Sequence, residues 1–189
     1  MEISLHALMN VMHGLLFGGF FLMVAWGGLM ALVRSSYEEV PSRLTPGGYR
    51  WEHGYWTTAA ALGWAAVLSG AYMVYPWYRA TPPAGTTDLT TFAKAKLLSD
   101  PRTVYWHTIG MEWKEHVAFF APIAITLVAY LVWRYRGDLR HFPQVRRAAT
   151  VFATVALFAT LVAGFFGAML DKAAPMQGGR NITFFRSAK

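Results

Sequence analysis

The stretch VYWHTIGMEWKEHVAFFAPIAITLVAYLVWR, residues Val104–Arg134, decides the fold class. It begins with ionisable side chains and then runs for 17 residues, Val117–Trp133, without a charge before Arg134. A run of this length is close to the minimum for a helix that crosses a hydrocarbon layer of about 30 Å. A histidine at the edge of such a span is costly to bury and is a candidate functional residue. His116 occupies this position, so the first question is whether it has a partner.

The composition is that of an integral membrane protein. Of the 189 residues, 55% are hydrophobic, 16% are aromatic and only 14% are charged, whereas soluble domains carry about 25% charged residues. Because the chain has no cysteine, a disulfide, a thiolate metal site and a covalent c-type haem are excluded. The net charge of +7 lies in loops beside apolar segments. Lipid of the bilayer is therefore the expected partner of these charges, and nucleic acid is not.

Four apolar segments follow one another along the chain, and we expect an all-α, four-helix transmembrane bundle that forms a single domain. The expected spans are residues 8–33, 55–75, 110–133 and 148–170, joined by short loops. A surface loop at 79–103, with a short amphipathic turn at Leu89–Leu98, and a polar tail at 171–189 complete the chain. Four spans place both termini on the same side of the membrane.

The distribution of arginine sets the expected orientation. The connections after the first and third spans are short and rich in arginine, and such loops are typically cytoplasmic. We therefore expect a protein of a bacterial cytoplasmic membrane with both termini outside.

Histidines occur at comparable depths on the first and third spans, which run in the same direction. His13 lies 21 residues before Arg34, and His116 lies 18 residues before Arg134. At 1.5 Å per residue, these two depths differ by about 4–5 Å. Histidines on two helices at similar depth are typical of proteins that hold haem b, where each imidazole gives one nitrogen to iron. The sequence therefore predicts His13 and His116 as axial ligands of a haem iron.

A second pair, His6 and His107, also matches in depth and lies nearer the outer interface. We count both as candidate cofactor-binding residues, although the spacing does not support two stacked haems. His6 is seven residues from His13 and shares its helix face, but His107 is nine residues from His116 and lies about half a turn away. His53 and His141, at the other end of the bundle, are expected to be interfacial.

The run Glu112-x-x-Glu115-His116 leaves other uses open. Glu112 and His116 share a helix face and, with His13, would form a His/carboxylate metal site. Lys114 inside the run opposes a compact cation site, and the chain has no second Glu-x-x-His motif. Glu112, Glu115 and His107 would also serve to exchange protons with a quinone. A purely structural interpretation of the same run is that these charged residues form salt bridges where the helix starts, at the level of the lipid headgroups.

A four-span chain with histidines on its first and third helices resembles the small b-type cytochrome membrane subunits that link quinone pools to respiratory enzymes. The resemblance covers Leu8–Leu170 and implies electron transfer between quinone and a partner subunit, with His13 and His116 as axial ligands. Two further runs, EHVAFFAPIAIT at Glu115–Thr126 and residues His141–Gly167, resemble small four-helix proteins associated with haem–copper oxidases.

The expected function is that of a membrane-embedded b-haem electron-transfer subunit of a respiratory or photosynthetic complex. It would exchange electrons with the quinone pool or with a partner redox subunit, and other membrane subunits would supply any catalysis. The alternative is a cofactor-free accessory subunit that stabilises a larger membrane complex.

Overall fold

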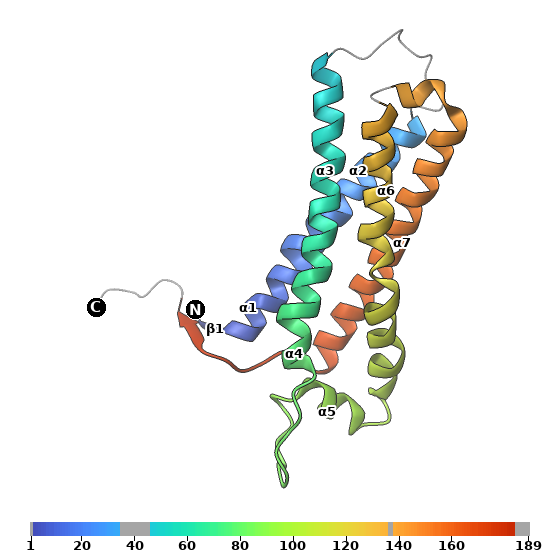
Figure 1. Cartoon of the computed structure of the whole chain (residues 1–189). Helices are drawn as coiled ribbons and strands as arrows, with labels where there is room; N and C mark the ends of the chain where they lie inside the picture. The colour runs from blue at the N-terminus through green and yellow to red at the C-terminus, as the bar shows by residue number, and fades with distance from the viewer. Residues whose placement is uncertain (1, 35–45, 136–137, 184–189) are drawn as a thin grey trace.

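The computed structural model of the chain describes residues 2–34, 46–135 and 138–183, and most of them lie in four long helical spans (Figure 1). The spans are Leu5–Arg34, Arg50–Tyr78, Trp106–Tyr135 and Pro143–Ala173, and each is long and apolar enough to cross a membrane. Each contains the segment predicted at its position. Each also extends beyond that segment at both ends, where polar and aromatic residues continue the helix.

Three of the spans combine α-helix with π-helical turns. The first span consists of α1 (Leu5–Val11), the π-helical segment η1 (Met12–Gly19) and α2 (Phe20–Arg34). The second span lies within α3 (Pro46–Ser69), the π-helical segment η2 (Gly70–Val74) and α4 (Tyr75–Tyr78). The third consists of the π-helical segments η3 (Trp106–Met111) and η4 (Trp113–Val117), followed by α6 (Phe120–Tyr135). The fourth is one α-helix, α7 (Pro143–Ala173).

The spans pack as a ring in which each touches two neighbours. The most extensive contacts join α6 to α7 and α3 to α6, and the ring is closed by α2 against α7 and by η1 and α2 against α3. The first and third spans therefore lie on a diagonal of the bundle. Residues on these two spans meet across the interior rather than along a shared helix seam.

Small residues bring the backbones close in the middle of the bundle. Ala25, Ala59 and Ala153 are fully buried, as are further alanines of α7. At Gly28 of α2, a Cβ atom would lie only 2.5 Å from the Trp56 ring of α3, so glycine is needed for the indole to fit. Such small residues let transmembrane helices approach closely, where lipid tails provide no hydrophobic driving force between helices. Ala159 and Ala163 of α7 are buried in the same way.

Both ends of the chain meet at one end of the bundle. Strand β1 (Glu2–Ser4) pairs antiparallel with β2 (Asn181–Thr183), with Ile3 opposite Ile182. We call this the termini end; it lies at the bottom in Figure 1 and also carries α5 (Ala93–Leu98). The opposite end, which carries the 3-10 turn η5 (Asp138–His141), is called the basic end. Whether the termini share one side of a membrane stays a prediction, since β1 and β2 show only that they share one end of the bundle.

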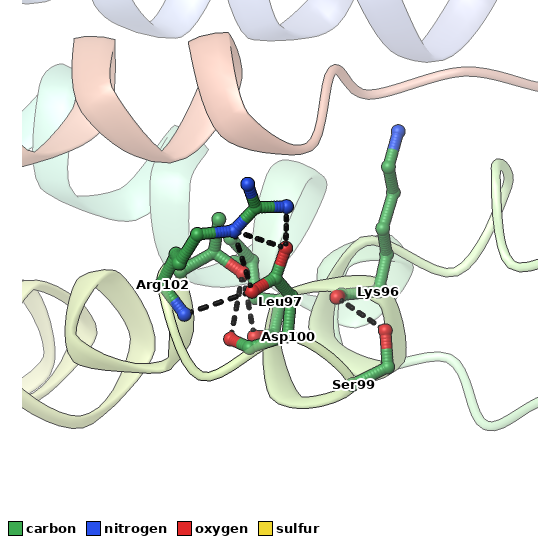
Figure 2. A network of polar contacts seen from close by, with 6 residues as sticks. Lys96, Leu97, Ser99, Asp100 and Arg102 are labelled. Atoms are coloured by element: carbon green, nitrogen blue, oxygen red, sulfur yellow. Dashed lines mark hydrogen bonds and ion pairs between the residues drawn. The ribbon is translucent and has the colours of Figure 1, made fainter.

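The predicted surface turn at 89–98 appears as α5, and a polar turn connects it to the third span. Figure 2 shows the Asp100 carboxylate bound by Arg102, with the Arg102 backbone amide 2.8 Å from Asp100 Oδ1 and Nη2 2.8 Å from Oδ2. The Thr103 hydroxyl donates to the Leu97 carbonyl at 2.9 Å. The Arg102 guanidinium and amide hold the pKa of the Asp100 carboxyl at about 2. This turn fixes the direction in which the third span starts.

Candidate functional site

The π-helical segments all lie in one half of the bundle. η1, η2, η3 and η4 all lie toward the termini end of their spans, whereas α2, most of α3 and α6 are regular towards the basic end. A π-helical turn widens the helix and leaves backbone groups with altered geometry, and such turns occur frequently at functional sites. The first three spans therefore carry irregular backbone at similar levels, around the interior of the termini end.

His13 of η1 is bound to the second span. Its Nδ1 atom lies 3.1 Å from Ser69 Oγ, and the Ser69 hydroxyl donates its only proton to the Ala66 carbonyl at 3.0 Å. Because that proton is used, His13 must donate its Nδ1–H to the Ser69 oxygen, and its Nε2 atom is then the acceptor in the neutral ring. The imidazole lies against Gly70, where a Cβ atom would be 2.6 Å from His13 Cε1.

Lys114 of η4 brings a positive charge to the same interior. Its ammonium lies against Gly167 of α7, where a Cβ atom would be 2.8 Å from Nζ. Lys114 and His13 interact electrostatically across the diagonal of the bundle, and this interaction is repulsive when both side chains are positively charged. In the described part of the chain, this ammonium has neither a hydrogen bond nor an ion pair. An ionisable residue inside a transmembrane segment is costly and is a functional candidate by default.

Glu115 connects the third span to the end of the second. It forms a hydrogen bond with the Tyr75 hydroxyl, and Arg79 Nη1 donates to the same hydroxyl oxygen at 2.6 Å. Since Arg79 donates to that oxygen, Tyr75 directs its own proton to the Glu115 carboxylate. Arg79 is exposed at the termini end. A chain of three polar groups thus runs from the surface to the residue next to Lys114.

His6 and His107 both contact α4, but they contact different rings. His107 Nδ1 lies 2.7 Å from the Tyr78 hydroxyl. The His6 ring stacks on Trp77 with 3.9 Å between ring centroids, and its Nδ1 atom lies 3.1 Å from the Gln177 carbonyl oxygen. His6 and His107, which were predicted at similar depth, thus contact the adjacent α4 residues Trp77 and Tyr78. Among the described residues, no hydrogen bond or ring stacking joins the two imidazoles to each other.

His116 points out of the bundle. Its Nε2 atom lies 3.2 Å from Glu112 Oε2, and the two side chains are 71% and 57% exposed. His13 points inward, against Ser69 and Gly70. The two predicted haem ligands therefore do not face each other, and the positions of their side chains do not fit bis-histidine ligation of one iron. Haem binding stays a prediction.

A compact metal site does not form from the same residues either. Among the described residues, no three His, Asp or Glu side chains come together closely enough to hold a metal ion. Glu112 and His116 are paired as the sequence suggested, but His13 is bound elsewhere. The 3.2 Å contact between His116 Nε2 and Glu112 Oε2 joins two residues near the start of the third span, and a salt-bridged helix start stays the structural interpretation.

The remaining two histidines lie at the basic end. His53 stacks on Trp133 of α6, with 4.8 Å between ring centroids, and its Nε2 atom is buried without a hydrogen-bond partner. His141 is exposed at the end of η5. His53 is thus more enclosed than an interfacial residue, because α3 and α6 bring it against an indole.

Comparisons with protein-family models, with curated proteins and with solved structures found no match to this chain.

Several site residues were not singled out by the sequence. Ser69 lies in a run rich in alanine and glycine, and Tyr75 and Tyr78 resemble ordinary aromatic anchors of a membrane interface. Lys114 was counted only as an obstacle to a metal site. The position of Lys114 at the centre of the charged run Glu112–His116, at the edge of a span, was the one sequence signal that pointed to the interior.

Proposed function

We propose that this chain is a membrane-embedded redox subunit of a respiratory or photosynthetic complex that exchanges electrons with the quinone pool or a partner redox subunit. The observation that supports this proposal best is the polar interior of the termini end, where His13 donates to Ser69 and Lys114 lies across the diagonal. A purely structural bundle gains nothing from ionisable groups at this depth, because each is costly to remove from water.

Quinone chemistry needs groups that exchange protons at the membrane edge, and the termini end supplies them. The neutral imidazole of His13 offers an acceptor at Nε2, and Glu115 accepts from Tyr75. Proton transfer by positioned imidazole and carboxylate groups is the ordinary form of general acid–base catalysis. The Arg79–Tyr75–Glu115 chain offers a connection between these groups and the exterior.

The membrane location, the orientation and the need for partner subunits are inferred from the composition of the chain and from how little of it lies outside the spans. The four apolar spans suit a bilayer, and the arginine-rich connections favour a cytoplasmic basic end, with both termini outside a bacterial cytoplasmic membrane. Outside the spans, the described residues form only α5, η5, two short strands and their connections. Catalysis of a complete redox reaction therefore requires other membrane subunits.

The test uses the chain purified from its native membrane with the subunits that accompany it. A reduced-minus-oxidised spectrum measures haem b, and solvent extraction measures quinone. Loss of a haem spectrum in both His13→Ala and His116→Ala, with retention in His141→Ala, would establish the predicted ligation and would require His116 to turn inward. Quinone above the level of the surrounding lipid supports the proposal whether or not haem is present. A colourless preparation without quinone contradicts it and leaves the accessory role.

A further inference from the structure

A groove lies between the first and second spans at the basic end, where α2 ends and α3 begins (Figure 1). Its volume is about 330 Å³, and it is lined by Val24, Arg50, Trp51, Gly54, Tyr55 and Thr58. Trp51 is 77% exposed, so the groove opens to the outside of the bundle. Arg50 begins the second span, and Thr58 lies about 12 Å further along the helix. The groove therefore runs from the membrane edge into the hydrocarbon layer.

Two glycines shape this groove. At Gly27 of α2, a Cβ atom would lie 2.8 Å from the Tyr55 hydroxyl oxygen, so the phenol fits there because glycine has no side chain. The Tyr55 hydroxyl donates to the Val24 carbonyl at 2.5 Å, which joins α3 to α2 behind the groove. At Gly54 of α3, in contrast, nothing in the described part of the chain lies within 4 Å of a Cβ atom. The surface above Gly54 is therefore open to a ligand.

Arg50 supplies the charge of the groove. It belongs to the lining itself, and its side chain is exposed at the start of the span. Among the described residues, its guanidinium has neither a hydrogen bond nor an ion pair. Glu52, the nearest acid along the chain, is not part of the lining. Because a guanidinium does not lose its proton in proteins, the head of the groove carries a permanent positive charge.

We propose that this groove is a binding site for an anionic phospholipid. The lipid phosphate binds the Arg50 guanidinium, and the first part of one acyl chain lies over Gly54, Tyr55 and Val24. Trp51 lies at the level of the headgroup, as tryptophan does at membrane interfaces. This assignment does not depend on the proposed redox function.

The lining favours an anionic phospholipid over other occupants of a bilayer. A guanidinium binds phosphate oxygens through two parallel, charge-assisted hydrogen bonds, and basic pockets between transmembrane helices bind anionic headgroups. A zwitterionic phospholipid gains less from Arg50, because its own cation lies beside the phosphate. A quinone is neutral and leaves the guanidinium without a partner. A span of another subunit would need contact over about 30 Å, whereas this groove extends for about 12 Å.

The test uses the full chain, purified with the subunits that accompany it, in phosphatidylcholine nanodiscs. Each sample contains a trace of a lipid with a diazirine in one acyl chain, and the probe is either phosphatidylglycerol or phosphatidylcholine with the same acyl chains. After illumination, labelled peptides are mapped by mass spectrometry. We expect the phosphatidylglycerol probe to label residues 50–58 and Val24 about 5- to 10-fold more than the phosphatidylcholine probe, the factor for one cation at a membrane surface.

Two variants probe the two parts of the site. Arg50→Gln removes the charge and should abolish the preference for phosphatidylglycerol. Gly54→Leu fills the open surface and should reduce labelling of residues 50–58 by both probes. The matched controls are Arg147→Gln, an exposed arginine at the start of α7, and Gly164→Leu, where a Cβ atom also meets nothing within 4 Å among the described residues. Neither control should change the labelling of residues 50–58.

Four results would overturn the proposal. Equal labelling by the two probes in the wild type would show that Arg50 does not select the headgroup. An equal loss in Arg147→Gln and Arg50→Gln would show that the basic end attracts anionic lipid only through its total charge. Displacement of the probe by inorganic phosphate would show that the acyl chain does not bind. Absence of label from residues 50–58, together with cross-links from the probe elsewhere, would show that another subunit covers the groove.

Discussion

Replacing Gly70 with alanine tests how closely the His13 imidazole lies against the second span. The added methyl group would lie 2.6 Å from His13 Cε1 and 3.1 Å from Nε2, well inside ordinary van der Waals contact. The ring would have to move and would lose its hydrogen bond to Ser69. Overpacking of this kind costs about 1–3 kcal/mol, and alanine recovers at most about 1 kcal/mol through its better helix propensity. With full recovery the expected net loss is roughly 0–2 kcal/mol, and relative to a glycine-to-alanine change that makes no clash it is about 1–3 kcal/mol.

The assay is thermal unfolding in detergent, in which 1 kcal/mol corresponds to about 2–4 °C for a chain of this size. Gly164→Ala is the matched control, because nothing lies within 4 Å of a Cβ atom at Gly164. In a double-mutant cycle, His13→Ala should remove most of the effect of Gly70→Ala, since the clash is with the imidazole. If Gly70→Ala is as stable as Gly164→Ala, or if the two substitutions are additive, the imidazole does not lie on Gly70.

Three further predictions concern other parts of the termini end. Asp100→Asn should lower the melting temperature at neutral pH, because the Arg102 bonds stabilise the charged carboxylate. These bonds hold the pKa of Asp100 at about 2, so their contribution to stability is present above the unfolded pKa of about 3.9 and is lost as pH falls towards 2. The melting temperatures of wild type and variant should therefore converge at low pH. Lys114→Met should raise the melting temperature in detergent, because it removes an ammonium that has no ion pair within the described residues; a large destabilisation would contradict the placement of Lys114. Gly179→Ala should speed amide hydrogen exchange in β1, because Gly179 has φ of +77° and a Cβ atom there would lie 3.0 Å from the His6 ring; unchanged exchange would show that this contact does not hold the two ends together.

The fold could be predicted from the sequence because the bilayer imposes long apolar segments. Each predicted span lies inside an observed one. What the sequence could not supply is the rotation of each helix about its axis. Depth places His13 and His116 at similar levels, but Phe120, Ile123 and Leu127 continue the face of His116 and are exposed. Their exposure, which only the structure shows, places His116 on the outward side of the third span.

The site depends on two features that periodicity does not encode. The π-helical segments rotate the residues that follow them, so a 100° per residue wheel misplaces side chains in η3 and η4. Partners such as Ser69 for His13 arise from packing between spans, and a hydroxyl in a run of small residues has no sequence signature of its own. The ion pair of Glu112 with His116 was readable, because it is local.

The most direct test of the account is the quinone content of the chain purified with its partner subunits in lipid nanodiscs, measured by solvent extraction and chromatography. We predict a fixed, stoichiometric amount of quinone that falls in His13→Ala and persists in His141→Ala. Quinone that merely follows its concentration in the nanodisc lipid, with no difference between the two variants, would contradict it.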